Sequence, residues 1–269
     1  MPLVTLPLVL TVVLLELAIG GAFLLWALDR TRQAPGGFLK LAAVVNTLAA
    51  LLAFGLLPAL PRGDLALRAG LQPTALDALA QAVPVVAVLM VAQLLAVFLP
   101  FRLVREVTGV GALLAGGLAL VAAAVARPSD SPYDIFALLA LPLGALALGG
   151  TSGAMLLGHW YLVTPKLSPA PLQRASLIVA GAILLQAALV AVTVARGELA
   201  GVTDTSLGIA IAIRVGVGIV MTFGLVLAGW WTARMNTQSS TGLLYVALGT
   251  VIAGELAARV LYYLTGAAV

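Results

Sequence analysis

Four ionisable side chains lie deep inside long apolar stretches of this chain: Glu16, Arg214, Glu255 and Arg259. A charged group at the centre of a bilayer costs roughly 3 kcal/mol on insertion scales, so such residues are functional candidates by default. A single histidine, His159, comes near the end of another apolar stretch. These five residues are the ones whose types and positions could support chemistry.

Glu255 and Arg259 are spaced to pair on one helix, because an acid four residues before a base is the favourable order. Tyr262 continues the same face one turn later. At 1.5 Å per residue, Arg214 lies about 12 Å deep in its own stretch, where it could face Glu255 from a neighbouring helix. Two interpretations stay open: an ion cluster that pins two helices together, or a polar ligand pocket that opens toward the outer leaflet and is lined by these four residues. Arginine does not release protons in proteins, so within this group only Glu255 could relay one.

A second polar layer lies in the inner half of the predicted membrane region. It contains Glu16 and Asn46, with Gln93 and Ser152 as further uncharged companions. We expect no basic residue at the level of Glu16, which makes it either a neutral hydrogen-bonding acid or a proton carrier. Glu16, Asn46 and His159 together form a candidate proton route toward the inner face.

His159 follows Ser152 by seven residues on one predicted helix. That spacing separates the two by about 10 Å, too far for a nucleophile and its base, so a serine-protease pair is excluded. His159 is either an interfacial histidine bonded to headgroups or loop carbonyls, or the inner end of the proton route. Pro165, shortly afterwards, is expected to help stop the helix.

The elements that must position these residues are membrane-spanning helices. The chain is 62% hydrophobic and 9% charged, whereas soluble domains are about 25% charged. Its apolar runs are about 20 residues long, the length that crosses a bilayer as a helix. We therefore predict an all-α, polytopic membrane protein with a single domain over 1–269. Its bundle of eight transmembrane helices is expected at 3–27, 38–60, 79–100, 107–126, 135–163, 170–195, 206–232 and 241–265.

Basic residues divide unequally between the two sets of predicted loops. By the positive-inside rule the basic-rich set faces the cytoplasm, which places both termini outside. This distribution also argues against a nucleic-acid-binding surface. The loops after odd-numbered helices carry Arg30, Arg32, Lys40, Arg102, Arg105, Lys166, Arg174 and Arg234, and those after even-numbered helices carry Arg62, Arg68, Arg127 and Arg196 with the acids Asp64, Asp77, Asp130, Asp134, Glu198 and Asp204.

The residues available as metal ligands are few: the chain has no cysteine and one histidine. Cysteine-ligated iron–sulfur clusters, thiolate zinc sites and a bis-histidine haem are therefore excluded within one chain. We expect no metal-bound or covalent cofactor here. Any electron or metal chemistry would need a cofactor held elsewhere, or a diffusible one.

The two halves of the chain, 1–134 and 135–269, are faintly alike. Gly20 and Gly21 in the first predicted helix correspond to Gly149 and Gly150 in the fifth. Arg102 after the third helix similarly corresponds to Arg234 after the seventh. This predicts two parallel four-helix repeats related by an axis along the membrane normal. The alternative is that small residues and terminal arginines recur in any polytopic protein.

The C-terminal stretch AGELAARVLYYLTG resembles the membrane-anchor subunits of dimethyl sulfoxide reductase- and polysulfide reductase-type molybdoenzymes. That family typically closes with Gly-Glu-x-x-x-Arg-x-x-Phe/Tyr-Tyr, which Gly254, Glu255, Arg259, Tyr262 and, loosely, Tyr263 match. PLVLTVVLLELAIGGAFLL looks like the family's first helix, and AIRVGVG matches its Ala-x-Arg in the seventh. The resemblance covers parts of the first, fifth, seventh and eighth predicted helices.

The resemblance implies a prokaryotic cytoplasmic-membrane subunit that exchanges electrons and protons with quinol and docks an iron–sulfur partner. One departure is that LLPALPRGDLALRAG, the loop after the second helix, lacks the family's histidine. The first hypothesis is thus a quinone-interacting subunit of a respiratory or related redox complex. The alternatives are a proton- or cation-coupled transporter for small molecules, or a scaffold subunit whose buried charges are structural.

Overall fold

The computed structural model describes residues 2–129, 131, 133–164, 167–200, 204–235 and 237–269. In this part of the chain the protein is an all-α bundle, and eight stretches are long and apolar enough to cross a membrane, as predicted. Lys166, Pro165 and Asp130, used above for topology and helix ends, lie outside the described residues. The long helices are α1 (Pro2–Arg30), α2 (Gly36–Gly55), α4 (Pro73–Val97), α5 (Arg102–Val125), α6 (Ile135–Val163), α7 (Ala170–Ala195) and α10 (Thr237–Thr265), and the seventh span is α8 (Thr205–Ala212), η2 (Ile213–Met221) and α9 (Thr222–Thr232).

The largest differences between predicted and observed helix ends, five or six residues, occur at three positions. The helix expected at 79–100 is α4, which begins at Pro73, and the one expected at 107–126 is α5, which begins at Arg102. Proline suits the first turn of a helix because that turn needs no N–H from it. The helix expected at 38–60 is α2, which ends at Gly55.

Three elements were not predicted. The connection between α2 and α4 contains a short 3-10 turn, η1 (Leu57–Ala59), and a five-residue helix, α3 (Asp64–Arg68). In the seventh span, η2 is a π-helix, whose hydrogen bonds run i→i+5. Such widened turns are frequent at functional sites. Here the widened turns include Arg214.

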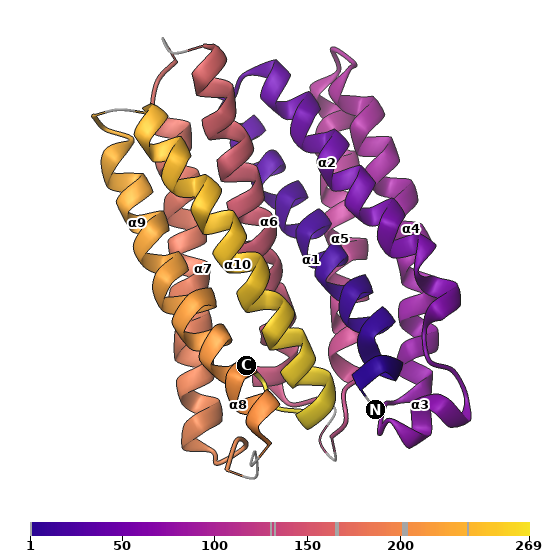
Figure 1. Cartoon of the computed structure of the whole chain (residues 1–269). Coiled ribbons are helices and arrows are strands. Elements are labelled where there is room, and N and C mark those ends of the chain that lie inside the picture. Colours follow the sequence, from indigo (N-terminus) through magenta and orange to yellow (C-terminus); the bar gives the residue numbers. More distant parts are fainter. Residues whose placement is uncertain (1, 130, 132, 165–166, 201–203, 236) are drawn as a thin grey trace.

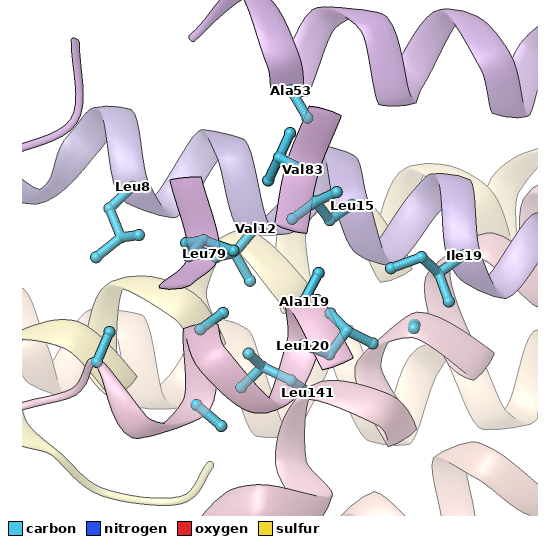
Figure 2. Packing of buried hydrophobic residues seen from close by; sticks show 14 of the residues in the cluster. Leu8, Val12, Leu15, Ile19, Ala53, Leu79, Val83, Ala119, Leu120 and Leu141 are labelled. Carbon is cyan, nitrogen blue, oxygen red and sulfur yellow. The ribbon is translucent and has the colours of Figure 1, made fainter. Parts of the chain in front are cut away.

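The core surrounds α1, which lies in the middle of the bundle with both chain ends at the same end of the molecule (Figure 1). Figure 2 shows the apolar side chains that α1 buries against its neighbours. The same cluster draws on α2, α4, α5 and α6. Its labelled members are Leu8, Val12, Leu15, Ile19, Ala53, Leu79, Val83, Ala119, Leu120 and Leu141.

Glycines let α1 and α6 approach to backbone contact. A Cβ on Gly149 would lie 2.3 Å from the Gly21 nitrogen, and one on Gly20 would lie 1.6 Å from the Ala145 carbonyl oxygen. Close approach of small residues stabilises helix pairs in lipid, where no hydrophobic force drives association. The paired glycines of the two halves therefore contact each other directly.

The helix neighbours in one half match those in the other. In the first half α1 packs on α2 and α5, α2 on α4, and α4 on α5; in the second, α6 packs on α7 and α10, α7 on α9, and α9 on α10. The contacts between halves are reciprocal, since α1 touches α10 and α5 touches α6. A parallel repeat would produce this pattern. The sequence repeat of 1–134 and 135–269 itself remains a prediction.

We expect the α1–α2 and α4–α5 connections to face the cytoplasm, which places both termini outside. The chain contains no cysteine, so single-cysteine variants can be labelled without background. Gln33→Cys and Leu103→Cys should react with an impermeant maleimide only after the cytoplasmic face is opened. Tyr133→Cys, at a position 77% exposed before α6, should react from outside. The opposite labelling pattern would invert the topology.

Candidate functional site

Glu255 lies at the centre of a buried polar cluster on α10. Its Oε1 accepts hydrogen bonds from Arg214 Nη1 and Gln186 Nε2, each at 2.8 Å, and its Oε2 accepts one from Arg259 Nη2 at 2.9 Å. The expected contacts of Glu255 with Arg214 and Arg259 are therefore present. Gln186, on α7, is a polar residue within an apolar stretch, and its partner could not be deduced from the sequence. Three donors from three segments hold this carboxylate.

Glu16 joins the same cluster from α1. Its Oε1 lies 3.1 Å from Arg259 Nε, and both side chains are fully buried. The expectation that no basic residue lies at the level of Glu16 is therefore wrong. The long Arg259 side chain bridges α10 to the neighbouring α1, a contact between helices that local spacing does not encode.

The Glu16–Arg259 pair is close but not aligned as a hydrogen bond. Neither Glu16 oxygen accepts a hydrogen bond from a described residue, and Arg259 Nε is likewise without one. Glu255, by contrast, has three donors. We refer to Glu16, Arg259, Glu255 and Arg214 as the charge cluster. With all four side chains ionised, the net charge of the cluster is zero. Its two carboxylates differ in the number of hydrogen bonds that they accept.

Gly144 on α6 provides the space for the charge cluster. A Cβ at this position would lie 2.6 Å from Glu16 Oε1, 2.7 Å from Arg259 Nη2 and 2.8 Å from Glu255 Oε2. The sequence shows Gly144 only as one more small residue in an apolar run. Gly144 makes room for the charged side chains because α6 packs against both α1 and α10.

The seventh and eighth spans touch backbone to backbone beside the cluster. A Cβ on Gly254 would lie 2.2 Å from Gly218 Cα, and Thr222 Oγ1 donates to Thr250 Oγ1 at 2.8 Å. This close packing brings Arg214, at the start of η2, within reach of Glu255. Polar residues across helix pairs stabilise association in membranes.

Tyr262 was expected to line a ligand pocket with the three charged residues. Its hydroxyl instead lies 3.1 Å from two carbonyl oxygens, those of Ala124 on α5 and Ala137 on α6. The neighbouring Tyr263 hydroxyl donates to Ala123 O at 2.8 Å. Both tyrosines therefore tie the C-terminal end of α10 to the helices beside it.

The other two residues of the proposed proton route lie apart from the cluster. Asn46 packs against Gly21, whose Cβ would fall 2.1 Å from Asn46 Oδ1. His159 Nδ1 lies 2.7 Å from the hydroxyl of Tyr245 at an exposed position. No hydrogen bond among the described residues connects Glu16, Asn46 and His159 into one chain.

The four expected pocket residues, Arg214, Glu255, Arg259 and Tyr262, are between 0 and 2% exposed. A ligand headgroup therefore cannot touch them in this conformation. An apolar groove of about 250 Å³ does lie nearby, between α1, α5 and α6. Gly20 in its wall is one helical turn from Glu16, and the opposite wall includes Pro142 and Ala145, which flank Gly144 on α6.

The site can be interpreted only from its own geometry, because comparison with known proteins gives no match. No protein-family model, curated protein or solved structure matches the chain. The resemblance of the C-terminal stretch to molybdoenzyme anchors therefore remains an expectation.

Proposed function

We propose that this integral membrane protein is the quinone-interacting subunit of a redox complex, and that its charge cluster holds and exchanges a proton within the bilayer. The proposal rests on a difference in hydrogen bonding between Glu16 and Glu255, two buried carboxylates that both lie beside Arg259. Glu255 has three hydrogen-bond donors, whereas Glu16 has none. Pairs of acids in different environments are the usual way to separate a fixed charge from an exchangeable proton.

In this proposal the two acids have different tasks. Hydrogen bonds to a carboxylate favour its ionised form, so Glu255 acts as the permanent counter-ion of Arg214 and Arg259. Glu16 is the residue that gains and loses a proton, since arginine cannot. From the sequence, Glu255 was expected to release the proton in the pocket and Glu16 was one possible proton carrier; the proposal leaves proton exchange to Glu16 alone.

The apolar groove between α1, α5 and α6 is the place where a quinone ring would lie, with Gly20 in its wall one helical turn from the buried Glu16. The groove wall contains Ile19, Gly20 and Gly117, so small residues leave room for a flat ring between apolar neighbours. Oxidation of a quinol to a quinone releases two electrons and two protons, and Glu16 would accept these protons one at a time, passing on the first before it takes the second. The chain has no cysteine to hold a cluster, so a metal-carrying partner, for instance an iron–sulfur subunit, would take the electrons while Glu16 takes a proton.

The test combines quinone analysis with infrared spectroscopy on the purified protein. We expect quinone to be extracted with the wild-type protein, and Gly117→Leu, which fills the groove, to weaken binding of a short-chain quinone analogue at least about ten-fold. Gly181→Leu is the matched control, because a Cβ at Gly181 meets open space. Glu16→Gln should remove a carboxyl C=O band that changes on reduction of bound quinone. Absence of extracted quinone, with analogue binding unchanged by Gly117→Leu, would remove the quinone function.

One observation favours a second candidate, a proton- or cation-coupled transporter. The charge cluster joins α1 of the first half to η2 and α10 of the second, and binding sites of repeat transporters lie near the midplane where the halves meet. Proteoliposomes would distinguish the two functions. A transporter should show solute uptake driven by a proton gradient and abolished by Glu16→Gln, whereas a scaffold subunit would show neither uptake nor a quinone-linked carboxyl signal.

A further inference from the structure

A cavity of about 490 Å³ opens at the end of the bundle opposite to the chain termini. It lies between the α1–α2 connection and the start of α5, far along α1 from the charge cluster. Its charged lining consists of Arg32, Lys40, Arg102 and Arg105 with a single acid, Asp29. These side chains give the cavity a formal charge of plus three, from four bases and one acid.

The single acid, Asp29, forms an ion pair with one of the four bases, Arg105. Arg105 Nε lies 3.0 Å from Asp29 Oδ2, and Arg105 Nη1 also donates to the Leu99 carbonyl at 3.3 Å. Arg32, Lys40 and Arg102 form no ion pair with any residue that the structure describes. Three cations therefore converge on one cavity without a counter-charge of their own.

Two helix N-termini add to the positive potential of the cavity. Gly36, the first residue of α2, and Arg102, the first residue of α5, both line it. Neither helix has a side-chain cap, because Pro35 and Phe101 precede them in extended conformation without a capping hydrogen bond. The first N–H groups of a helix lack partners within the helix, and together with the helix dipole they form a ready anion site. A Cβ on Gly36 would meet nothing within 4 Å, so the start of α2 is accessible from the cavity.

The rim of the cavity indicates what carries the anion. Phe98, Phe101 and Leu103 beside it are 58%, 63% and 75% exposed. In a bilayer, exposed apolar side chains at the end of membrane-spanning helices would face the headgroup and upper acyl region of the lipid. Basic pockets between transmembrane helices are the usual sites for anionic headgroups.

We infer that this cavity binds a phosphate group, and that the phosphate belongs to an anionic phospholipid. The phosphate oxygens would accept charge-assisted hydrogen bonds from Arg32, Lys40 and Arg102. They would also accept hydrogen bonds from the first N–H groups of α2 and α5. The acyl chains would lie along the exposed aromatic and leucine side chains of the rim. The inference is independent of the quinone proposal, which concerns the charge cluster and the groove between α1, α5 and α6.

The test follows lipid-dependent thermal stability of the purified protein in a neutral detergent. We expect phosphatidylglycerol or cardiolipin to raise the unfolding temperature, and phosphatidylcholine to leave it unchanged. The double variant Arg32→Gln/Lys40→Gln should bind anionic lipid at least about ten-fold more weakly. Both side chains are exposed, so their replacement should leave the fold intact. Arg174→Gln is the matched control, since Arg174 is an exposed base at the same end of the bundle outside this cavity.

A second variant tests the site by adding a negative charge to the cavity instead of removing positive charges from it. Gly36→Asp would place a carboxylate in the first turn of α2, where it would occupy the anion site. It should therefore lose the response to anionic lipid, while the lipid-free protein becomes no less stable because an acid in the first turn, after the N-cap position of Pro35, interacts favourably with the helix dipole.

Two soluble probes, inorganic phosphate and glycerol 3-phosphate, identify the source of the phosphate. If they stabilise the protein as well as the lipid does, the site is a phosphate site for a soluble ligand. If only the lipid acts, it is a phospholipid site. An equal response to phosphatidylcholine and phosphatidylglycerol, or a lipid response that survives both Arg32→Gln/Lys40→Gln and Gly36→Asp, would overturn the inference.

Discussion

Replacing Glu255 by alanine is expected to lower the free energy of unfolding by about 3–5 kcal/mol, the range found when one partner of a buried ion pair is removed. Glu255 neutralises Arg214 at 2.8 Å and Arg259 at 2.9 Å. After its loss two buried guanidiniums share only Glu16. Thermal or denaturant unfolding in a mild detergent measures the effect.

The double variant Glu255→Ala/Arg214→Ala should be more stable than Glu255→Ala alone, by about 2 kcal/mol. It leaves Glu16 and Arg259 as one neutral pair, so the uncompensated charge is gone. Arg196→Ala is the control for loss of an arginine as such. Arg196 pairs with Asp134 at 2.7 Å but is 42% exposed, and surface pairs contribute at most about 1 kcal/mol. Strictly additive effects of the Glu255 and Arg214 changes would show that the two side chains are not coupled.

Replacing Gly149 by leucine is expected to have the second large effect, a loss of about 3 kcal/mol or more in stability, the upper end for overpacked cores. The added side chain would collide with the backbone of α1, which cannot move aside as a flexible side chain could. A Cβ at this position already lies 2.3 Å from the Gly21 nitrogen and 2.6 Å from the Leu17 carbonyl oxygen. The crossing of α1 and α6 would therefore have to open.

A size series makes the result specific for this crossing. Gly149→Ala should destabilise measurably and Gly149→Leu more, as judged by yield of monodisperse protein and unfolding temperature. The same two changes at Gly181, where a Cβ meets open space on α7, should have little effect. Equal losses at both positions would point to helix propensity or insertion instead of packing.

The spans themselves could be predicted because the bilayer imposes a length and an apolar composition on each helix. The Glu255–Arg259 pair could be predicted for a related reason, since its spacing lies within one helix. The salt bridge of Glu16 with Arg259 could not, because it depends on which helices are neighbours. For that reason a residue expected to be isolated lies in the same cluster as Glu255.

Other features depended on geometry that residue types do not specify. Gly144 has a role only because three charged side chains meet over it. Tyr262 shares a face with Glu255 and Arg259, but its hydroxyl reaches α5 and α6 rather than an open cavity. The basic residues at the α1–α2 connection predicted topology, whereas the cavity that collects them requires the fold.

The widened turns of η2 also affect how this span should be aligned with those of other proteins. In a regular α-helix, residues eight positions apart are rotated by about 80° relative to each other. Arg214, Gly218 and Thr222 nevertheless all contact α10. The π-helix reduces this rotation, so the span carries more residues over the same seam than an α-helix would. A related chain with a regular helix here would be shorter within residues 213–221, and a gap inside a membrane span, normally a sign of misalignment, would then be the correct alignment.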